Sequence, residues 1–347
     1  MGDAGVDAVA VDLDPLRRPA GLRDIGSYER LCAVPWHRRL AAVATGMAAA
    51  TVAVAAGVWA ASVSGLLAQA PVIAVVVVGY AALGAWAFIW WTTELGRRVK
   101  LASFAWANGW AYADVLEHTR RPGSAFTRVL RGRERAVVAS DDPRLPFELG
   151  RHFSLPRGRD EAATVQRPFA FVELPLPRRV PNIVLRNRGR SIIPSLGFGL
   201  GNARLELEGG FAKRFLLFAP EGYQEDALYI FTPDLMARVL DLGSSAEIEL
   251  SGDRLFVYLP HRTRFDRPDT MAAVLVLAEE LHRRFAARTE RYRDDRATPG
   301  GPSVALRGQR LAGGGVPLAG IAATAGVVLL STAVTWFGVW GAPLLFG

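Results

Sequence analysis

The distribution of charge along the 347 residues constrains this chain more than any other feature. No Asp, Glu, Lys or Arg occurs from Leu40 to Thr93 or from Leu311 to Gly347, although such residues make up 21% of the chain. A charge at the centre of a bilayer costs about 3 kcal/mol, and this cost excludes charged residues from spanning helices. The pattern therefore predicts membrane-spanning helices on both sides of a charged domain.

The first uncharged run is long enough for two spans, because about 20 residues cross roughly 30 Å of hydrocarbon. The stretch Ser64–Pro71, which contains Gly, Gln and Pro, lies near its middle and predicts a turn. We therefore expect spans at about 40–63 and 72–93, and a third within 316–340. Buried helices of one large core are the alternative interpretation.

Basic residues flank the three expected spans on one side. They are Arg38 and Arg39 before the first, Arg97, Arg98 and Lys100 after the second, and Arg307 and Arg310 before the third. The positive-inside rule then predicts a multi-pass protein of the bacterial inner membrane. Its N-terminus and residues 94–310 would be cytoplasmic, and its C-terminus would lie outside.

The charged region has the sequence pattern of an α+β domain. Short β-like runs ("RAVVAS", "PFAFVEL", "PNIVLRN", "ARLELE") are separated by Pro and Gly, which favours antiparallel strands. The predicted fold class is an α+β cytoplasmic domain, antiparallel strands with C-terminal helices, anchored by three transmembrane helices. The predicted parts are a cytoplasmic segment 1–39, a transmembrane hairpin 40–93, the domain 94–294, a flexible Gly-rich linker 295–315 and the third span 316–340.

Helix signals are strongest in the second half of the domain. "YQEDALYIF" reads as one short helix, and Thr232, Pro233 and Asp234 predict the start of another through a capping hydroxyl, a proline at the first position and a carboxylate at the positive helix end. "AEIEL", "SGDR" and "LFVYL" predict a hairpin with its turn at SGDR. A last helix, starting at Asp266 or Asp269, has an apolar face that suits packing on the domain's own sheet, with a coiled-coil dimer as the alternative.

The recognisable catalytic and cofactor motifs are absent or incomplete. "GFGLGNA" lacks the third glycine of a dinucleotide loop and precedes a strand-like run, so we interpret it as a loop. Glu279 and His282 form a single Glu-x-x-His, where carboxylate-bridged metal sites use two. Cys32 is the only cysteine, which excludes an internal disulfide and a cysteine metal cage. The sequence therefore predicts no catalytic set, no metal site and no cofactor.

Two groups of residues are candidates for binding. Arg186, Arg188 and Arg190 recur at every second position, so on a strand they would share one face, which suits anionic lipid headgroups or an acidic protein partner. An ordinary surface in an Arg-biased chain is the alternative. The second group is Tyr223, Asp226 and Asp234, which would converge on a ligand unless they serve only as helix starts and turns.

Several segments resemble a family of uncharacterised actinobacterial integral-membrane proteins, related to a broader bacterial family of unknown function. The resemblance covers about Ser103–Asp294 and involves "FAWANGWAY", "LPRRVPNIVL", a Phe-x-x-x-Phe segment at Phe211 and Phe215, "DALYIFTPDLM", and Arg254–Tyr258. It implies paired N-terminal spans before such a domain. It carries no known activity, so it implies no residue roles.

These observations favour a membrane-anchored, non-enzymatic binding or scaffolding module as the function. Its predicted partners are the lipid bilayer and, at the inner leaflet, an anionic lipid or an acidic protein. Nucleic acid is disfavoured although the net charge is +8, because the excess of Arg over Lys reflects a general compositional bias. The alternatives are an accessory subunit of a membrane transport or envelope-assembly complex, and an enzyme of unrecognised type using residues 223–234.

Overall fold

A computed structural model describes eleven stretches of the chain and a few isolated residues between them. These stretches are residues 11–32, 70–117, 121–127, 132–154, 168–189, 191–192, 202–205, 209–242, 246–297, 301–305 and 308–309. The chain divides into two compact units. Unit 1 comprises Met1–Val115, Ala136–Arg144 and Arg264–Leu275, and unit 2 comprises Leu116–Arg135, Leu145–Thr263 and Val276–Gly347.

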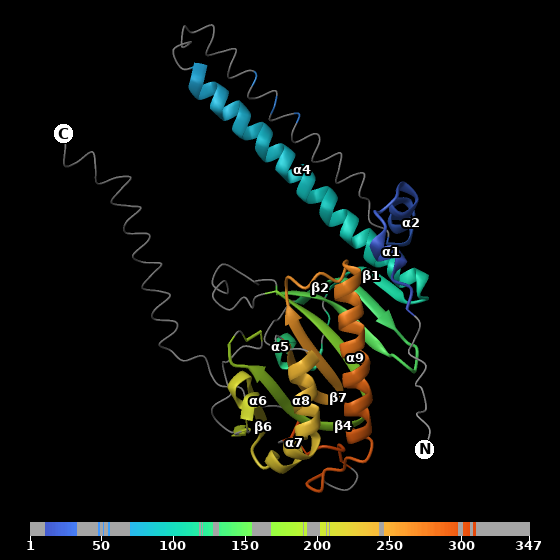
Figure 1. Cartoon of the computed structure of the whole chain (residues 1–347), viewed down its shortest axis with the longest axis vertical. Coiled ribbons are helices and arrows are strands. Elements are labelled where there is room, and N and C mark those ends of the chain that lie inside the picture. Colours follow the sequence, from blue (N-terminus) through green and yellow to red (C-terminus); the bar gives the residue numbers. More distant parts are fainter. Residues whose placement is uncertain are drawn as a thin grey trace, which may run out of the picture. The chain divides into compact units, whose positions relative to one another are not determined.

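The described residues form helices and strands in a mixed order along the chain (Figure 1). The helices are α1 (Asp14–Arg17), α2 (Leu22–Cys32), α4 (Ala70–Ala107), α5 (Ser124–Thr127), α6 (Gly209–Arg214), α7 (Gln224–Ile230), α8 (Pro233–Leu242) and α9 (Pro268–Thr289). The strands are β1 (Ala111–Glu117), β2 (Gly132–Ser140), β3 (Phe147–Ser154), β4 (Phe169–Asn187), β5 (Asn202–Leu205), β6 (Phe215–Pro220) and β7 (Glu247–Pro260). Their order in the sheet is β1-β2-β3-β4-β6-β5, with β7 also paired with β4.

Unit 1 is built on the C-terminal part of α4. Val99 and Ala102 of α4 are fully buried in a cluster with Tyr28 of α2. The Tyr28 hydroxyl donates a 2.7 Å hydrogen bond to Asp114, and Arg98 lies 3.4 Å from the same carboxylate. Gly109 follows the helix with φ 72°, a conformation that favours glycine and ends helices.

The prediction of three transmembrane helices is wrong for the described part of the chain. Within those residues no helix combines the length and the apolar character that crossing a bilayer requires. The second expected span falls on α4, which runs on without a break through Glu94 and Arg98 into the packed part of unit 1. The first and third expected spans lie outside the described residues.

This finding overturns the predicted fold class of a domain anchored by three transmembrane helices, and with it the integral-membrane description. The predicted multi-pass location in the inner membrane, with residues 94–310 cytoplasmic, is contradicted by the same observation. The physical reason lies in the composition of α4. The uncharged run is only part of this helix, which also contains the charged and buried residues that follow, so the absence of charge over that run did not by itself indicate a span.

Unit 2 is organised around one long antiparallel strand pair. "PFAFVEL" and "PNIVLRN", predicted as separate strands, are the two halves of β4, and both halves pair with β7. The predicted hairpin turn at SGDR is wrong, because β7 runs from Glu247 to Pro260 as one strand. Gly252, with φ 62°, lets β7 bend at this point instead of reversing.

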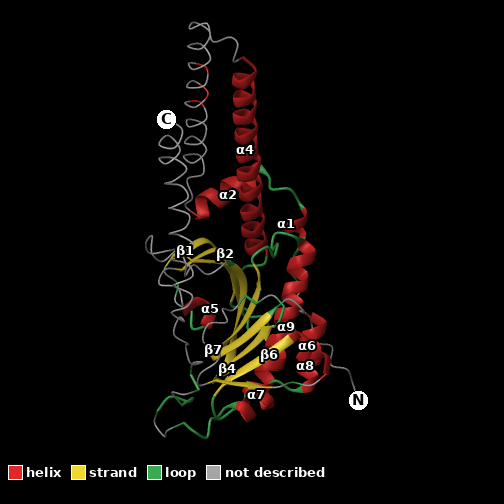
Figure 2. Cartoon of the chain, turned by 90° about the vertical axis from the view of Figure 1, so that its left-hand side faces the viewer, coloured by secondary structure: helices red, strands yellow, loops and turns green. Residues whose placement is uncertain are grey.

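Aromatic residues fill the core on one face of these strands. Phe126 of α5 lies 5.2 Å, between ring centroids, from both Phe169 and Phe171 of β4. Phe256 and Tyr258 of β7 complete this cluster. The helix α8 lies on the opposite face of β4, β6 and β7 from α5 (Figure 2). The strands are therefore covered on both faces in unit 2.

The helix predictions of the second half are largely confirmed. The predicted helices appear as α7, α8 and α9, and the predicted apolar face of α9 is buried from Met271 to Phe285. Thr232 stands at the cap position of α8, where its carbonyl accepts the Met236 amide, while its hydroxyl donates to Asp234. Phe211 lies in α6, whereas Phe215 begins β6.

Candidate functional site

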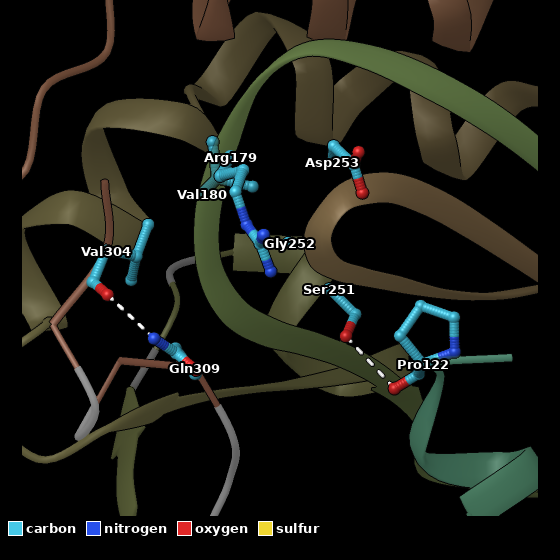
Figure 3. A pocket seen from close by; sticks show the side chains of 8 residues that line it. All are labelled: Pro122, Arg179, Val180, Ser251, Gly252, Asp253, Val304 and Gln309. Atoms are coloured by element: carbon cyan, nitrogen blue, oxygen red, sulfur yellow. Dashed lines mark hydrogen bonds between the residues drawn. The ribbon is translucent and has the colours of Figure 1, made fainter. Parts of the chain in front are cut away.

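The candidate site is a pocket at the point where β4 and β7 are both irregular. The register of the pair shifts between Pro175 and Val180 and again between Val180 and Ile183. Such bulges are frequent next to functional sites, because they redirect side chains. Here they accompany a cavity of about 230 Å³, lined by Pro122, Arg179, Val180, Ser251, Gly252, Asp253, Val304 and Gln309 (Figure 3).

Arg179 supplies the positive charge of this pocket. Its guanidinium lies against Gly252, so that a Cβ placed on that glycine would be 3.5 Å from Nη2 (Figure 3). The side chain is exposed, and within the described part of the chain no hydrogen bond or ion pair engages it. Its neighbour Arg178, by contrast, donates a 2.6 Å bond to the Glu290 carbonyl. Arg179 is thus available to a ligand.

The other polar groups of the pocket are already oriented by the protein. The Ser251 hydroxyl donates to the Pro122 carbonyl at 3.1 Å, and the Gln309 amide donates to the Val304 carbonyl at 2.9 Å (Figure 3). Asp253 lines the cavity and lies 3.8 Å from Arg254. The pocket therefore presents one unengaged cation beside groups that are held in place.

A buried carboxylate, that of Glu249, orders the chain next to the pocket. It accepts hydrogen bonds from the Ser124 amide at 2.8 Å and from the side chains of Asn182 and Tyr258 at 2.7 Å each. Burial raises the pKa of Glu249 above its ordinary value, although these donors favour the charged form. The network ties the loop containing Pro122 to β4 and β7.

The segment after α9 forms one wall of the pocket. We call its described residues 290–297, 301–305 and 308–309 the strap. Asp294 accepts a 2.8 Å hydrogen bond from the Tyr223 hydroxyl and a 2.9 Å bond from the Ala305 amide. Further along, the Gly308 carbonyl accepts a 2.7 Å bond from the Asn182 amide, and Val304 is buried. The strap includes residues predicted to be a flexible linker.

The residues predicted to converge in the 223–234 cluster do not form one site. Tyr223 and Asp226 both contact the strap, Tyr223 through Asp294, and Asp226 through the Tyr292 hydroxyl at 2.8 Å. Asp234 instead faces α9, 3.4 Å from Arg284. Two of the three therefore hold the strap, and the third lies at the start of α8 as a helix-terminal charge.

Of the three arginines predicted to share a strand face, only Arg186 and Arg188 are described, and they do not share a strand. Arg186 is on β4 and donates a 2.6 Å bond to the Ser191 hydroxyl, and burial lowers its pKa. Arg188 lies beyond the strand end at Asn187, where its amide donates to the Arg214 carbonyl at 2.8 Å. Arg190 lies outside the described residues. The two that are described do not lie on one continuous strand.

A cluster of three carboxylates around Arg121 was missed by the sequence reasoning. Arg121 bonds Glu134 with two nitrogens, each at 2.7 Å, and also contacts Glu148 and Glu173. Its guanidinium lies 4.6 Å from the centroid of the Phe171 ring. Glu134 is fully buried, and this cluster, which we call the Arg121 cluster, connects β2, β3 and β4.

The Arg121 cluster predicts acid sensitivity. Burial alone would raise the pKa of Glu134, but Arg121 outweighs it and lowers the pKa from 4.5 to about 2. A carboxyl with a lowered pKa in the folded state stabilises the fold above its unfolded pKa, and this contribution disappears as the pH falls towards 2. We expect a loss of about 3 kcal/mol between pH 4.5 and 2, measured by urea unfolding, and a smaller loss in Glu134→Gln. Equal slopes would contradict the prediction.

Arg179 was also missed, although the residues around it indicate an irregular strand. Three prolines, Pro175, Pro177 and Pro181, interrupt "LPLPRRVPN" within a run that otherwise reads as strand. Proline cannot donate to a sheet ladder, so it occurs at strand edges and bulges. A bulge near Arg179 could have been predicted from these residues, but the partner strand that completes the pocket could not.

Comparisons with known proteins identify no family for this chain. No family model and no curated protein matches it. One solved structure, the crystal structure of the mycobacterial trehalose monomycolate transport factor A, TtfA, aligns with 14% identity over 55% of this chain and 96% of that chain, at a TM-score of 0.38. A likeness at this level carries no argument about function. The resemblance to an actinobacterial membrane-protein family stays a prediction.

Proposed function

We propose that unit 2 is a binding module that holds an acidic side chain of a partner protein in the pocket beside Arg179. The observation that supports this most directly is the exposed guanidinium at a concave site, without a described partner. A guanidinium binds a carboxylate through two parallel N–H donors, which gives both affinity and orientation. Gln309 and Ser251, already held by the Val304 and Pro122 carbonyls, would shape the cavity around the guest.

The size of the cavity favours a single side chain over a larger ligand. Pockets for drug-sized molecules are roughly 300–1,000 Å³, whereas this one is about 230 Å³. A lipid surface fits less well, because an anionic bilayer attracts several basic residues on an open face. One protruding carboxylate is the better match.

The test uses the full chain and a fluorescein-labelled hexaglutamate peptide, with hexaglutamine as the neutral reference. Fluorescence anisotropy at low salt is expected to give at least tenfold weaker binding of hexaglutamate to Arg179→Gln than to the wild type, because a charge-assisted, bidentate contact is lost. Amide signals of Gly252 and Gln309 are expected to shift on titration. Arg204→Gln is the matched control, since Arg204 is exposed on β5 and removing it changes the net charge equally.

The Arg204→Gln control distinguishes binding at the Arg179 pocket from general electrostatic attraction between an acidic peptide and a basic protein. Equal weakening in Arg179→Gln and Arg204→Gln would mean that only net charge matters, and the proposal would be wrong. Vesicles containing phosphatidylglycerol provide the second arm. If Arg179→Gln lost vesicle binding but kept peptide binding, the pocket would recognise anionic lipid and not an acidic protein segment.

A further inference from the structure

The strap is held at two adjoining places, and Tyr223 takes part in both. At the first, the Tyr223 hydroxyl donates to Asp294, and Arg296 lies over the Tyr223 ring, 4.5 Å from its centroid. At the second, Gly308 packs directly on the same ring. A Cβ built on Gly308 would lie 2.6 Å from Cζ of Tyr223 and 2.8 Å from Cγ1 of Val304. The strap therefore fits this position only with glycine at residue 308.

At the first place, ion pairs and a hydrogen bond also hold the strap against unit 2. Arg296 lies 3.1 Å from Asp226 and 3.5 Å from Asp294, and the Tyr292 hydroxyl donates to Asp226. Burial alone would raise the pKa of Asp294, but bonds from the Ala305 amide, Tyr223 and Arg296 outweigh it and lower the pKa. Lifting the strap would also uncover the buried Tyr223 ring and Val304, so the seated arrangement is the favoured one, while the aromatic cluster around Phe126 does not include these residues.

The second place is continuous with the pocket. Gly308 is bonded to the Asn182 amide of β4, and Asn182 itself bonds the buried Glu249. Val304 and Gln309, which precede and follow Gly308 in the chain, line the same cavity as Arg179. When the strap is seated the cavity has this wall, and when it lifts the wall is lost. Ligand binding and strap seating are therefore linked events.

We propose that the strap is a gate for the pocket, seated on Tyr223 when the acidic segment is bound and lifted to release it. This inference rests on the proposed function of the pocket. Because the pocket is complete only with the strap in place, the apparent affinity is reduced by the fraction of molecules in which the strap is lifted. Bound ligand, in turn, slows the lifting.

Amide hydrogen exchange, followed by NMR in the full chain without ligand, measures how often the strap leaves its seated position. The Asn182 amide reports the second place and the Ala305 amide reports the first. Gly308→Ala is expected to raise both exchange rates at least tenfold and to weaken hexaglutamate binding at least threefold. The matched control is Gly189→Ala, whose new Cβ would meet only ordinary contacts at 3.5 Å, and it is expected to change neither.

A second pair of variants covers the case in which Gly308→Ala disturbs folding. Tyr223→Phe removes only the hydroxyl bonded to Asp294 and is expected to raise exchange at Ala305 about tenfold. Tyr229→Phe makes the same change on an exposed tyrosine of α7, the helix that begins directly after Tyr223, and is expected to have no effect. Unchanged exchange in Tyr223→Phe and Gly308→Ala would overturn the inference.

The two readouts separate failure of the gate from failure of the proposed function. If Gly308→Ala speeds exchange but binds hexaglutamate like the wild type, the strap moves without controlling the pocket, and the gate is rejected while the proposed function stands. If the wild-type chain itself does not distinguish hexaglutamate from hexaglutamine, the proposed function fails and the gate is rejected with it.

Discussion

Replacing Arg121 with Met is expected to lower the free energy of unfolding by about 3–5 kcal/mol, because it leaves a buried charge without its partner. Arg121 is the cation that faces Glu134, Glu148 and Glu173 together, and Glu134 has no contact with solvent. Without the guanidinium, at least one of these carboxyls must take up a proton or draw in water. Urea unfolding of the full chain, followed by circular dichroism at pH 7, measures the loss.

Arg144→Met is the matched control for this experiment. Arg144 also contacts a carboxylate, that of Asp142 at 3.0 Å, but its side chain is 67% exposed. Exposed pairs contribute less than about 1 kcal/mol, so this variant should unfold almost like the wild type. The double variant Arg121→Met/Glu134→Gln should recover part of the loss, since it removes a buried charge. Similar midpoints for the Arg121 and Arg144 variants would show that the Arg121 cluster does not stabilise unit 2.

Replacing Glu249 with Ala is expected to cost at least about 3 kcal/mol, because it removes a fully buried carboxylate that accepts several hydrogen bonds. The donors to this carboxylate are the amide and hydroxyl of part-buried Ser124, the Asn182 side chain and the buried Tyr258 hydroxyl. Each unsatisfied buried group costs about 1–3 kcal/mol, and removal of the side chain also leaves a cavity among packed aromatic rings. The same urea titration measures the effect.

The matched control here is Glu225→Ala, because Glu225 is exposed on α7. A surface substitution of this kind changes stability by less than about 0.5 kcal/mol. Tyr258→Phe, which removes one donor but keeps the carboxylate, should lie between the two. If Glu249→Ala were as stable as Glu225→Ala, the buried network would have no role in holding the Pro122 loop against the strands.

Elements whose signals are local in the chain were predictable. The start of α8 at Pro233 and the end of α4 before Gly109 follow from residues within one helical turn, and the buried face of α9 follows from its spacing. The individual strand runs were also recognised. Their joining into β4 and the bend of β7 were not, because a bulge and a tight turn use the same residue types.

The candidate site was predicted only in fragments for the same reason. Tyr223 and Asp226 were singled out, but their partners in the strap are more than sixty residues away. Arg179 carries no signal of its own in an arginine-rich chain. Its importance comes from Gly252 and Gln309, which long-range pairing brings to the same pocket.

By itself, the sequence determined where charge is excluded, where helices begin and end, and which short runs become strands, because these properties depend on neighbouring residues. Only the tertiary structure decided that β4 and β7 form one bent pair, that three carboxylates share Arg121, and that the strap closes one side of a pocket. These features are contacts between groups far apart in the chain, and their energies depend on burial and geometry that exist only after folding.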